Sequence, residues 1–290
     1  ELGDEMDIKL FVCCDKPVNV PKHPLLVPLQ VGAALAGEHF PGFLHDDAGD
    51  SISEKNRSYC ELTGQYWAWK NVEADYYGFF HYRRYLYPNE AARLPYIIEG
   101  EPTLQMLDRL GYERFAELIQ KWDVVFPKGE NMHIPVREHY ASAPFHHVED
   151  LNLAEQILAG RFPEYSDGAK GYLANTICYF GNIFVMKKQV FQEYCEWLFP
   201  ILEEFDRQKD VSGYCAQERR VDGYLAERLL GIYRAYHQEL RVLELPRVHF
   251  VEKPVERCGK QVVNMMLPPG SRRRAEIKFW KKWIGRKLYG

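Results

Sequence analysis

A chain of 290 residues, of which 46% are hydrophobic and 27% charged, has the size and composition of a globular protein with one large core. It has no run of about 18 apolar residues, which excludes a membrane-spanning helix, and its acidic start lacks the pattern of a secretion signal. The seven cysteines are scattered and form no Cys-x-x-Cys pair, so we expect reduced thiols in a cytoplasm and neither a disulfide framework nor a structural zinc site.

The first part of the chain alternates between predicted strands and helices. An apolar run at 8–14 predicts a buried strand that opens into a Pro-rich loop. The Ser-x-x-Glu spacing at 51–54 predicts the start of a helix that continues to about residue 70. A second strand is expected at 76–80, and a further helix at 103–121.

The second part continues this alternation after a long loop at 127–150, a feature that is often functional. Strands are expected at 123–126, 181–186 and 240–251, and helices at 150–160, 188–206 and 219–237. Strands that alternate with helices predict an α/β domain with a Rossmann-like, mostly parallel central sheet flanked by helices. We place this domain at residues 7–255.

Acidic and polar residues gather between 45 and 56, in a loop that leads into the predicted helix. Asp46, Asp47 and Asp50 come before the helix, and Lys55 and Asn56 lie on its first turns. Loops that follow the strands of an α/β sheet are the usual place for a ligand, so we expect these five residues to bind substrate. The alternative is that the three carboxylates are solvated turn and cap residues.

A second polar group follows the strand predicted at 76–80. His81, Arg83 and Arg84 stand there among tyrosines. A guanidinium group can bind two phosphate oxygens at once, so arginines at a strand exit suit a diphosphate. The alternative is that the two arginines form structural salt bridges with the aspartates at 46–50.

These segments together resemble the capsular polysaccharide synthesis proteins that carry domain of unknown function 4422. The resemblance covers about residues 7–250, and its most specific part is the His81-Tyr-Arg-Arg-Tyr85 run that follows Tyr66-Trp-Ala-Trp-Lys-Asn71. Further matching residues are Cys14-Asp15-Lys16-Pro17, Gln30-Val-Gly-Ala-Ala-Leu35, Asp46-Asp47 through Asn56, Tyr59-Cys-Glu-Leu-Thr63, Glu149-Asp-Leu151, Gly181-Asn-Ile-Phe-Val-Met186, Tyr194-Cys-Glu-Trp-Leu198 and Glu227-Arg-Leu-Leu230. The chain departs from the family at Asp15, where a histidine is more usual.

The resemblance implies a glycosyltransferase with a GT-A-like fold that serves capsule, exopolysaccharide or lipopolysaccharide O-antigen assembly. It implies hexosyl transfer from a UDP-sugar, with galactosyl or galactofuranosyl as the favoured group. The acceptor would be a growing glycan, with a polyprenyl-diphosphate-linked glycan expected. A binding protein that lost catalysis and a phosphosugar transferase of the same pathway are the alternatives.

The resemblance also directs the search for the groups that carry the reaction. GT-A enzymes commonly hold a divalent cation with an Asp-x-Asp motif, and His81-Tyr-Arg-Arg84 stands at the equivalent place, so we expect cations of the chain to stabilise the leaving diphosphate. Mg²⁺ or Mn²⁺, held by His81 or by the aspartates at 46–50, remains the alternative. The candidates for the base, taken from late in the chain, are Glu227, Asp222, Asp150 and Glu218, and His147 is expected to contact the acceptor. The alternative for Glu227 is a salt bridge with Arg220 or Arg228.

The last residues are strongly basic, unlike the rest of the chain. Residues 271–290 carry eight Lys or Arg and one Glu, and apolar residues recur there at three- and four-residue steps. This pattern predicts an amphipathic helix at a membrane surface, within a tail that we place at residues 256–290. We therefore expect a peripheral protein on the cytoplasmic face of the inner membrane. A tail that folds back on the acidic domain is the alternative, and nucleic acid is disfavoured because that domain repels phosphates.

Overall fold

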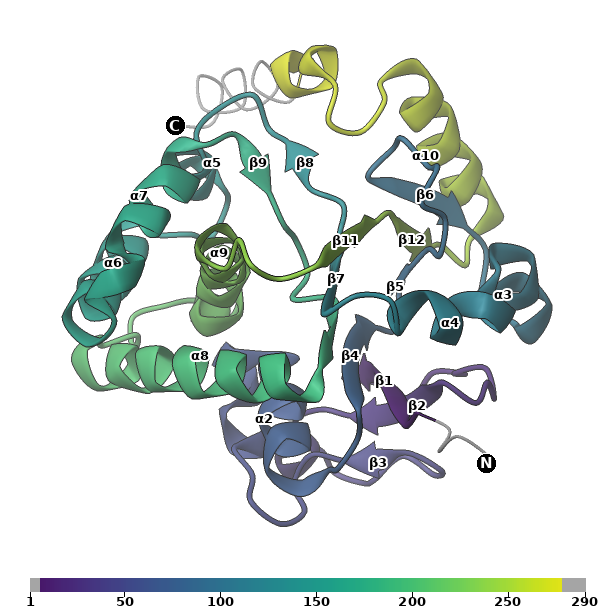
Figure 1. The fold of residues 1–290 in the computed structure, drawn as a ribbon, viewed down its shortest axis with the longest axis horizontal. Helices are drawn as coiled ribbons and strands as arrows, with labels where there is room; N and C mark the ends of the chain where they lie inside the picture. Colours follow the sequence, from purple (N-terminus) through teal and green to yellow (C-terminus); the bar gives the residue numbers. More distant parts are fainter. Residues whose placement is uncertain (1–5, 278–290) are drawn as a thin grey trace.

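A single large sheet forms the centre of the computed structural model, which describes residues 6–277 (Figure 1). Along the sheet the strands are ordered β11-β7-β10-β4-β1-β2-β3. Their bounds are β1 Ile8–Cys14, β2 Leu26–Gln30, β3 Leu44–His45, β4 Tyr76–His81, β7 Val124–Pro127, β10 Phe184–Lys187 and β11 Val242–Leu245. Neighbours pair in parallel except around β10, which runs antiparallel to both β4 and β7. The predicted mostly parallel sheet is confirmed.

Shorter strands extend the sheet beyond the end of β4. The chain turns at Tyr82 and Arg83 and returns as β5 (Arg84–Leu86), which places His81 opposite Arg84. Strand β12 (Arg247–Phe250) pairs with β5 and with β6 (Tyr96–Glu99). A separate two-stranded sheet joins β8 (Glu130–Asn131) to β9 (Ile177–Cys178).

Helices cover both faces of the sheet (Figure 1). Alternate residues of β1 point to opposite faces, as the pleat requires: Phe11 belongs to one core cluster and Leu10 to the other. The helices of the first face are α2 (Leu62–Asn71), α5 (Val136–Ser142), α6 (Val148–Arg161), α7 (Ser166–Ala174), α8 (Lys188–Gln208) and α9 (Val221–Tyr236). The second face is covered by α3 (Leu104–Leu110) and α4 (Phe115–Ile119).

Several predicted elements are interrupted in the structure. The helix expected from 51 divides into the turn Ser53–Lys55, α1 (Asn56–Tyr59) and α2, with a break at Cys60. The helix expected at 103–121 breaks at Gly111, whose φ of 87° ends α3. Pro246 separates β11 from β12 because it cannot donate a ladder hydrogen bond.

The C-terminal region leaves the sheet after β12. Helix α10 (Pro254–Met266) packs beside β6, and the chain is described as far as residue 277. The rest of the amphipathic helix predicted at 271–290 lies outside the described residues. Among those that are described, no helix combines the length and apolar character needed to cross a bilayer.

Candidate functional site

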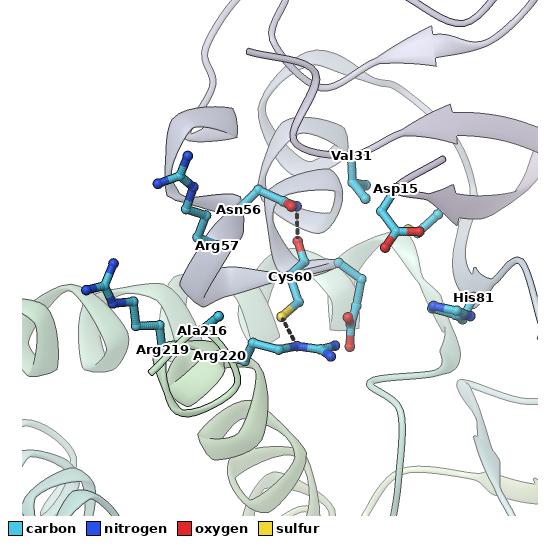
Figure 2. Close-up of a pocket in the computed structure, with 11 residues that line it drawn as sticks. Asp15, Val31, Asn56, Arg57, Cys60, His81, Ala216, Arg219 and Arg220 are labelled. Carbon is cyan, nitrogen blue, oxygen red and sulfur yellow. Dashed lines mark hydrogen bonds between the residues drawn. The ribbon is translucent and has the colours of Figure 1, made fainter. Parts of the chain in front are cut away.

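A cleft of about 460 Å³ opens at the carboxyl ends of β1 and β4. This is the edge at which open α/β sheets bind their ligands. The residues that line it are Cys13, Asp15, Val31, Asn56, Arg57, Cys60, Glu61, His81, Ala216, Arg219 and Arg220 (Figure 2).

Two walls of different origin face each other across the cleft. Asp15 and His81 extend from the strand ends on one side, whereas Arg57, Arg219 and Arg220 lie on the other, as Figure 2 shows. The first of these arginines belongs to α1, and the other two belong to the turn at 218–220 that leads into α9. All three arginines are exposed. Arg219 donates to the Tyr214 and Ser212 carbonyls, and Arg220 donates through Nε to Cys60 Sγ at 3.3 Å, so each keeps further N–H groups for a ligand.

The break between α1 and α2 shapes the cleft floor. Cys60 has a backbone φ of 53°, a value that residues other than glycine rarely adopt and that is often found at functional sites. Asn56 stabilises this turn, because its Nδ2 donates to the Cys60 carbonyl at 2.7 Å and to Thr63 Oγ1 at 3.0 Å. Burial raises the pKa of the Cys60 thiol to about 12, so this cysteine is a neutral lining group and not a thiolate nucleophile.

His81 is a neutral hydrogen-bond donor at the end of β4. Burial, together with Arg84 and Arg83, lowers its pKa to about 3. Its Nδ1 lies 3.2 Å from the backbone nitrogen of Arg83 and accepts that N–H. The single proton of the ring therefore resides on Nε2, where it can be donated to a ligand oxygen.

Glu61 is the carboxylate of the cleft that sequence reasoning missed. Its Oε1 accepts a hydrogen bond of 2.8 Å from Nδ2 of Asn182, and burial raises its pKa. Its place within the matched Tyr59-Cys-Glu-Leu-Thr63 segment was the one signal available, because nothing in the local sequence indicates the turn at Cys60. Arg219 and Arg220 were also missed as ligand groups, since two arginines before a helix are common on surfaces.

The two arginines predicted for the diphosphate lie beside the cleft and do not line it. Arg83 is exposed and stacks on the Tyr82 ring, with its guanidinium carbon 5.0 Å from the ring centroid. Arg84 is half-buried, and burial and the neighbouring Arg247 lower its pKa. Within residues 6–277 neither arginine forms an ion pair with the aspartates at 46–50. The alternative that these arginines form structural salt bridges with the aspartates is therefore wrong.

The aspartate cluster supports the wall of the site instead of facing into it. Asp46 is fully buried and accepts hydrogen bonds from the backbone of Gly32 and Ala33 at 2.9 and 3.0 Å. Hydroxyl groups of Ser53 and Thr63 complete its shell at 2.5 Å each. A carboxylate with four internal donors is closed to a ligand, which corrects the expected contact between Asp46 and the donor sugar.

The other members of the segment at 45–56 separate in space. Asp47 pairs with His39 at 2.8 Å, and Asp50 accepts a hydrogen bond from the Tyr66 hydroxyl at 3.1 Å. Lys55 forms an ion pair with Asp206 at 3.0 Å. None of these three lines the cleft, so Asn56 is the one residue of the five expected ligands that does.

The candidates for the base also have internal partners. Asp150 is buried and bound by Lys209 at 2.8 Å and by the Tyr214 hydroxyl, so it is a structural carboxylate and not an accessible base. Glu227 accepts a hydrogen bond from the backbone N–H of Gly181 at 2.6 Å and forms an ion pair with Arg228 at 2.9 Å. This is the salt bridge considered as the alternative to a role as the base.

The two remaining late carboxylates lie near the start of α9. Asp222 is fully buried and accepts a hydrogen bond from the Ser58 hydroxyl. Glu218 lies 3.2 Å from Nε2 of His147, the residue expected at the acceptor, and His147 stacks on Tyr214. Neither carboxylate lines the cleft, and His147 does not either.

The residues that could bind a metal ion lie outside the cleft. His39, His45 and Asp47 bring their ligand atoms within 4.8 Å of one another and are the group of this kind found in the described residues. Two imidazoles and a carboxylate suit a divalent transition metal. None of the three lines the cleft, and His81 is not part of such a group in that stretch of the chain.

Comparison with solved structures places the fold. The apo structure of the bifunctional glycosyltransferase WbbM matches 85% of this chain with a TM-score of 0.80 and 33% sequence identity. The fold is therefore that of a GT-A-like glycosyltransferase. The matched region spans 46% of the WbbM chain, less than half of its length.

Comparison with protein-family models identifies the family of the chain. The model described as Domain of unknown function (DUF4422) matches residues 9–238, and the chain belongs to this family. The resemblance noted from the sequence is thus confirmed. No curated protein matches the chain.

Proposed function

We propose that the protein transfers a hexosyl group from a UDP-sugar to a glycan acceptor during bacterial surface-polysaccharide synthesis. A galactosyl group, in the pyranose or furanose form, and a polyprenyl-diphosphate-linked acceptor are the favoured substrates. The observation that carries the proposal is the cleft itself. On a GT-A-like sheet, the guanidinium group of Arg220 points toward the neutral donor His81 at the strand ends, and Arg57 and Arg219 add positive charge on the same side of the cleft as Arg220.

These groups match the charge of a nucleoside diphosphate. Arginine binds phosphate oxygens through a planar fork, and positive groups fixed before the reaction stabilise the negative charge that develops on the leaving diphosphate. We propose that the three arginines and the His81 Nε2–H provide this stabilisation, and that a cation held by carboxylates is not needed for it. Transfer should then persist in the presence of a chelator.

Two carboxylates, Asp15 and Glu61, line the cleft, and we propose that Glu61 activates the acceptor. Its raised pKa makes it a stronger base than an exposed glutamate, and Asn182 fixes its orientation. In the proposed step Glu61 takes the proton of the acceptor hydroxyl, and the acceptor oxygen forms a bond with the anomeric carbon. The bond from that carbon to the diphosphate oxygen breaks, and UDP leaves with the electron pair.

The test combines donor binding with turnover. UDP and the correct UDP-sugar should raise the melting temperature by mass action, and UDP should be released when an acceptor is supplied. Arg220→Ala should lower the rate by a factor of about 100 to 1000, the usual cost of losing one such contact. Arg114→Ala, which removes a mostly exposed arginine outside the cleft, is the matched control and should leave the rate unchanged.

The alternatives give different results in the same assay. A non-catalytic binder would shift its melting temperature without releasing UDP, and a phosphosugar transferase would release UMP. A normal rate for Arg220→Ala would remove the cleft from the reaction. If no nucleotide raises the melting temperature, the proposal fails.

A further inference from the structure

Helix α10 turns its apolar side away from the protein. Val255, Met265 and Met266 are 87%, 79% and 73% exposed, and none of the residues of the helix is buried. Val262 is exposed on the same side, since the steps of seven and four residues from Val255 to Val262 and Met266 follow the helical repeat. A surface helix of a globular protein normally presents this side to the core.

The polar side of the same helix faces the domain. Gln261 Nε2 donates to the Ile98 carbonyl of β6 at 2.9 Å. Arg274, from the segment after the helix, donates to Asn264 Oδ1 at 2.7 Å and to the Tyr96 hydroxyl at 2.9 Å. Polar contacts therefore fix α10 in an orientation that leaves its apolar side without a partner among the described residues.

The charge of this region is opposite to that of the domain. Residues 252–290 carry eleven Lys and Arg and three Glu, whereas the other residues carry twelve more acidic than basic side chains. In the described part, Arg272 and Arg273 are exposed close to α10 in sequence. An exposed apolar stripe that is followed in the sequence by a dense run of basic residues matches the boundary between anionic headgroups and acyl chains.

We infer that α10 is an interfacial helix that lies on an anionic phospholipid surface, with Val255, Val262, Met265 and Met266 inserted among the lipids. The exposed arginines that follow contact the headgroups. A second copy of the chain is a poorer occupant because it would bring the same positive charge to the contact. The inference rests on α10 and its charge, and it holds whether or not the proposed transfer reaction is correct.

The experiment is vesicle flotation of the full chain. Vesicles of phosphatidylcholine mixed with phosphatidylglycerol should carry the protein upward, and vesicles of phosphatidylcholine alone should do so weakly. The variant V255S/V262S/M265S/M266S should partition about tenfold less or weaker still, since interfacial binding scales with the apolar area that is buried. The variant R272S/R273S should bind anionic vesicles less and with a weaker dependence on salt.

Two controls distinguish lipid binding by α10 from a general loss of apolar surface or of folding. L35S/L104S removes two half-exposed leucines elsewhere, 45% and 47% exposed, and should float like the wild type. Each variant should have the same melting temperature as the wild type, and UDP should raise it by the same amount. A loss of flotation is then distinguishable from a failure of the proposed function. Unchanged flotation of the quadruple variant, or a wild type that ignores anionic vesicles, overturns the inference. The inference is also overturned if light scattering shows that the wild type is a dimer, the quadruple variant is a monomer, and neither binds vesicles.

Discussion

Glu61 owes its place in the cleft to one unusual backbone conformation. The positive φ of Cys60 ends α1 and starts α2 in a new direction, so that two consecutive side chains, Cys60 and Glu61, face the cleft. Asn182, from the loop before β10, then holds the carboxylate by a hydrogen bond of 2.8 Å. Burial disfavours the charged form, and this raises the pKa of Glu61.

The pH dependence of transfer should report this residue. A base acts in its deprotonated form, so the rate should fall as the pH is lowered through the raised pKa of Glu61, on a limb that lies above the usual pKa of glutamate, about 4.3. Glu61→Gln should remove the limb and lower the rate by a factor of about 100 to 10,000. The measurement is UDP release over a pH series.

Glu117→Gln changes an exposed carboxylate of α4 and serves as the matched control, with both rate and limb retained. If Glu61→Gln keeps the acid limb of the wild type, the limb belongs to another group. Glu61 is then not the base.

Local sequence located part of the site and failed where the site is assembled from distant segments. His81 and Asn56 were found because each follows a recognisable strand or helix start, and both line the cleft. Arg219 and Arg220 come from a turn more than 130 residues later and reach the cleft through the packing of α9 against α1. The prediction for Asp46 was wrong because the sequence around a carboxylate does not reveal whether it accepts hydrogen bonds from the protein itself or from a ligand.

At the level of the element, the close approach of α7 and α9 depends on Gly231. A Cβ added to Gly231 would collide with the ring of Tyr172, which is buried. Gly231→Ala should therefore destabilise the protein by about 1–3 kcal/mol through overpacking. Gly171→Ala, at a helical position of α7 with open space around it, should be neutral or stabilise by about 0.5–1 kcal/mol. Urea unfolding midpoints compare the two, and equal midpoints would mean that the helices can separate without cost.

Asp222, in the first turn of α9, makes stability depend on pH. Burial and the charge of Asp206 raise its pKa to about 8, whereas an aspartate in the unfolded chain titrates near its usual pKa of about 3.9. Between these values the unfolded chain releases a proton that the folded protein keeps, so Asp222 lowers the free energy of unfolding as the pH rises from about 4 to about 8. Below that window both states are protonated and this loss disappears.

Asp222→Asn should remove this slope and be more stable than the wild type near pH 8, by more than about 1 kcal/mol. Urea unfolding at a series of pH values measures it. The matched control is Asp167→Asn, which changes an exposed carboxylate of α7 and should follow the wild-type curve. Parallel curves for wild type and Asp222→Asn would show that Asp222 is ionised in the folded protein at neutral pH.

Element positions were predicted well where burial sets the pattern and poorly where single residues break it. The strand expected at 8–14 is β1, a short apolar run that is buried at nearly every position, and the helix expected at 188–206 is α8, whose buried residues recur with the helical period. The breaks at Cys60 and Gly111 were missed, since a helical repeat can continue in sequence on both sides of a turn. No helix was expected at 254–266, where the structure has α10, although Val255, Val262 and Met266 are spaced for one side of a helix.

For the whole molecule, the acidic domain and the basic C-terminal region should be separable. A chain that ends after Val251 keeps β12 and its pairs with β5 and β6, and loses α10, which buries none of its own residues. Its melting temperature should differ from that of the full chain by no more than about 4 °C, which corresponds to about 1 kcal/mol. It should keep its response to UDP and lose flotation with anionic vesicles.

A chain that ends after Leu240 is the contrasting control. It also lacks β11 and β12, whose Leu245 and Val248 are fully buried in the core, so it should fail to fold cooperatively. If the chain that ends after Val251 melts as poorly as this shorter one, α10 is part of the folding unit. The contact of α10 with Ile98 and that of Arg274 with Tyr96 then stabilise the domain, and the boundary between domain and tail lies beyond residue 266.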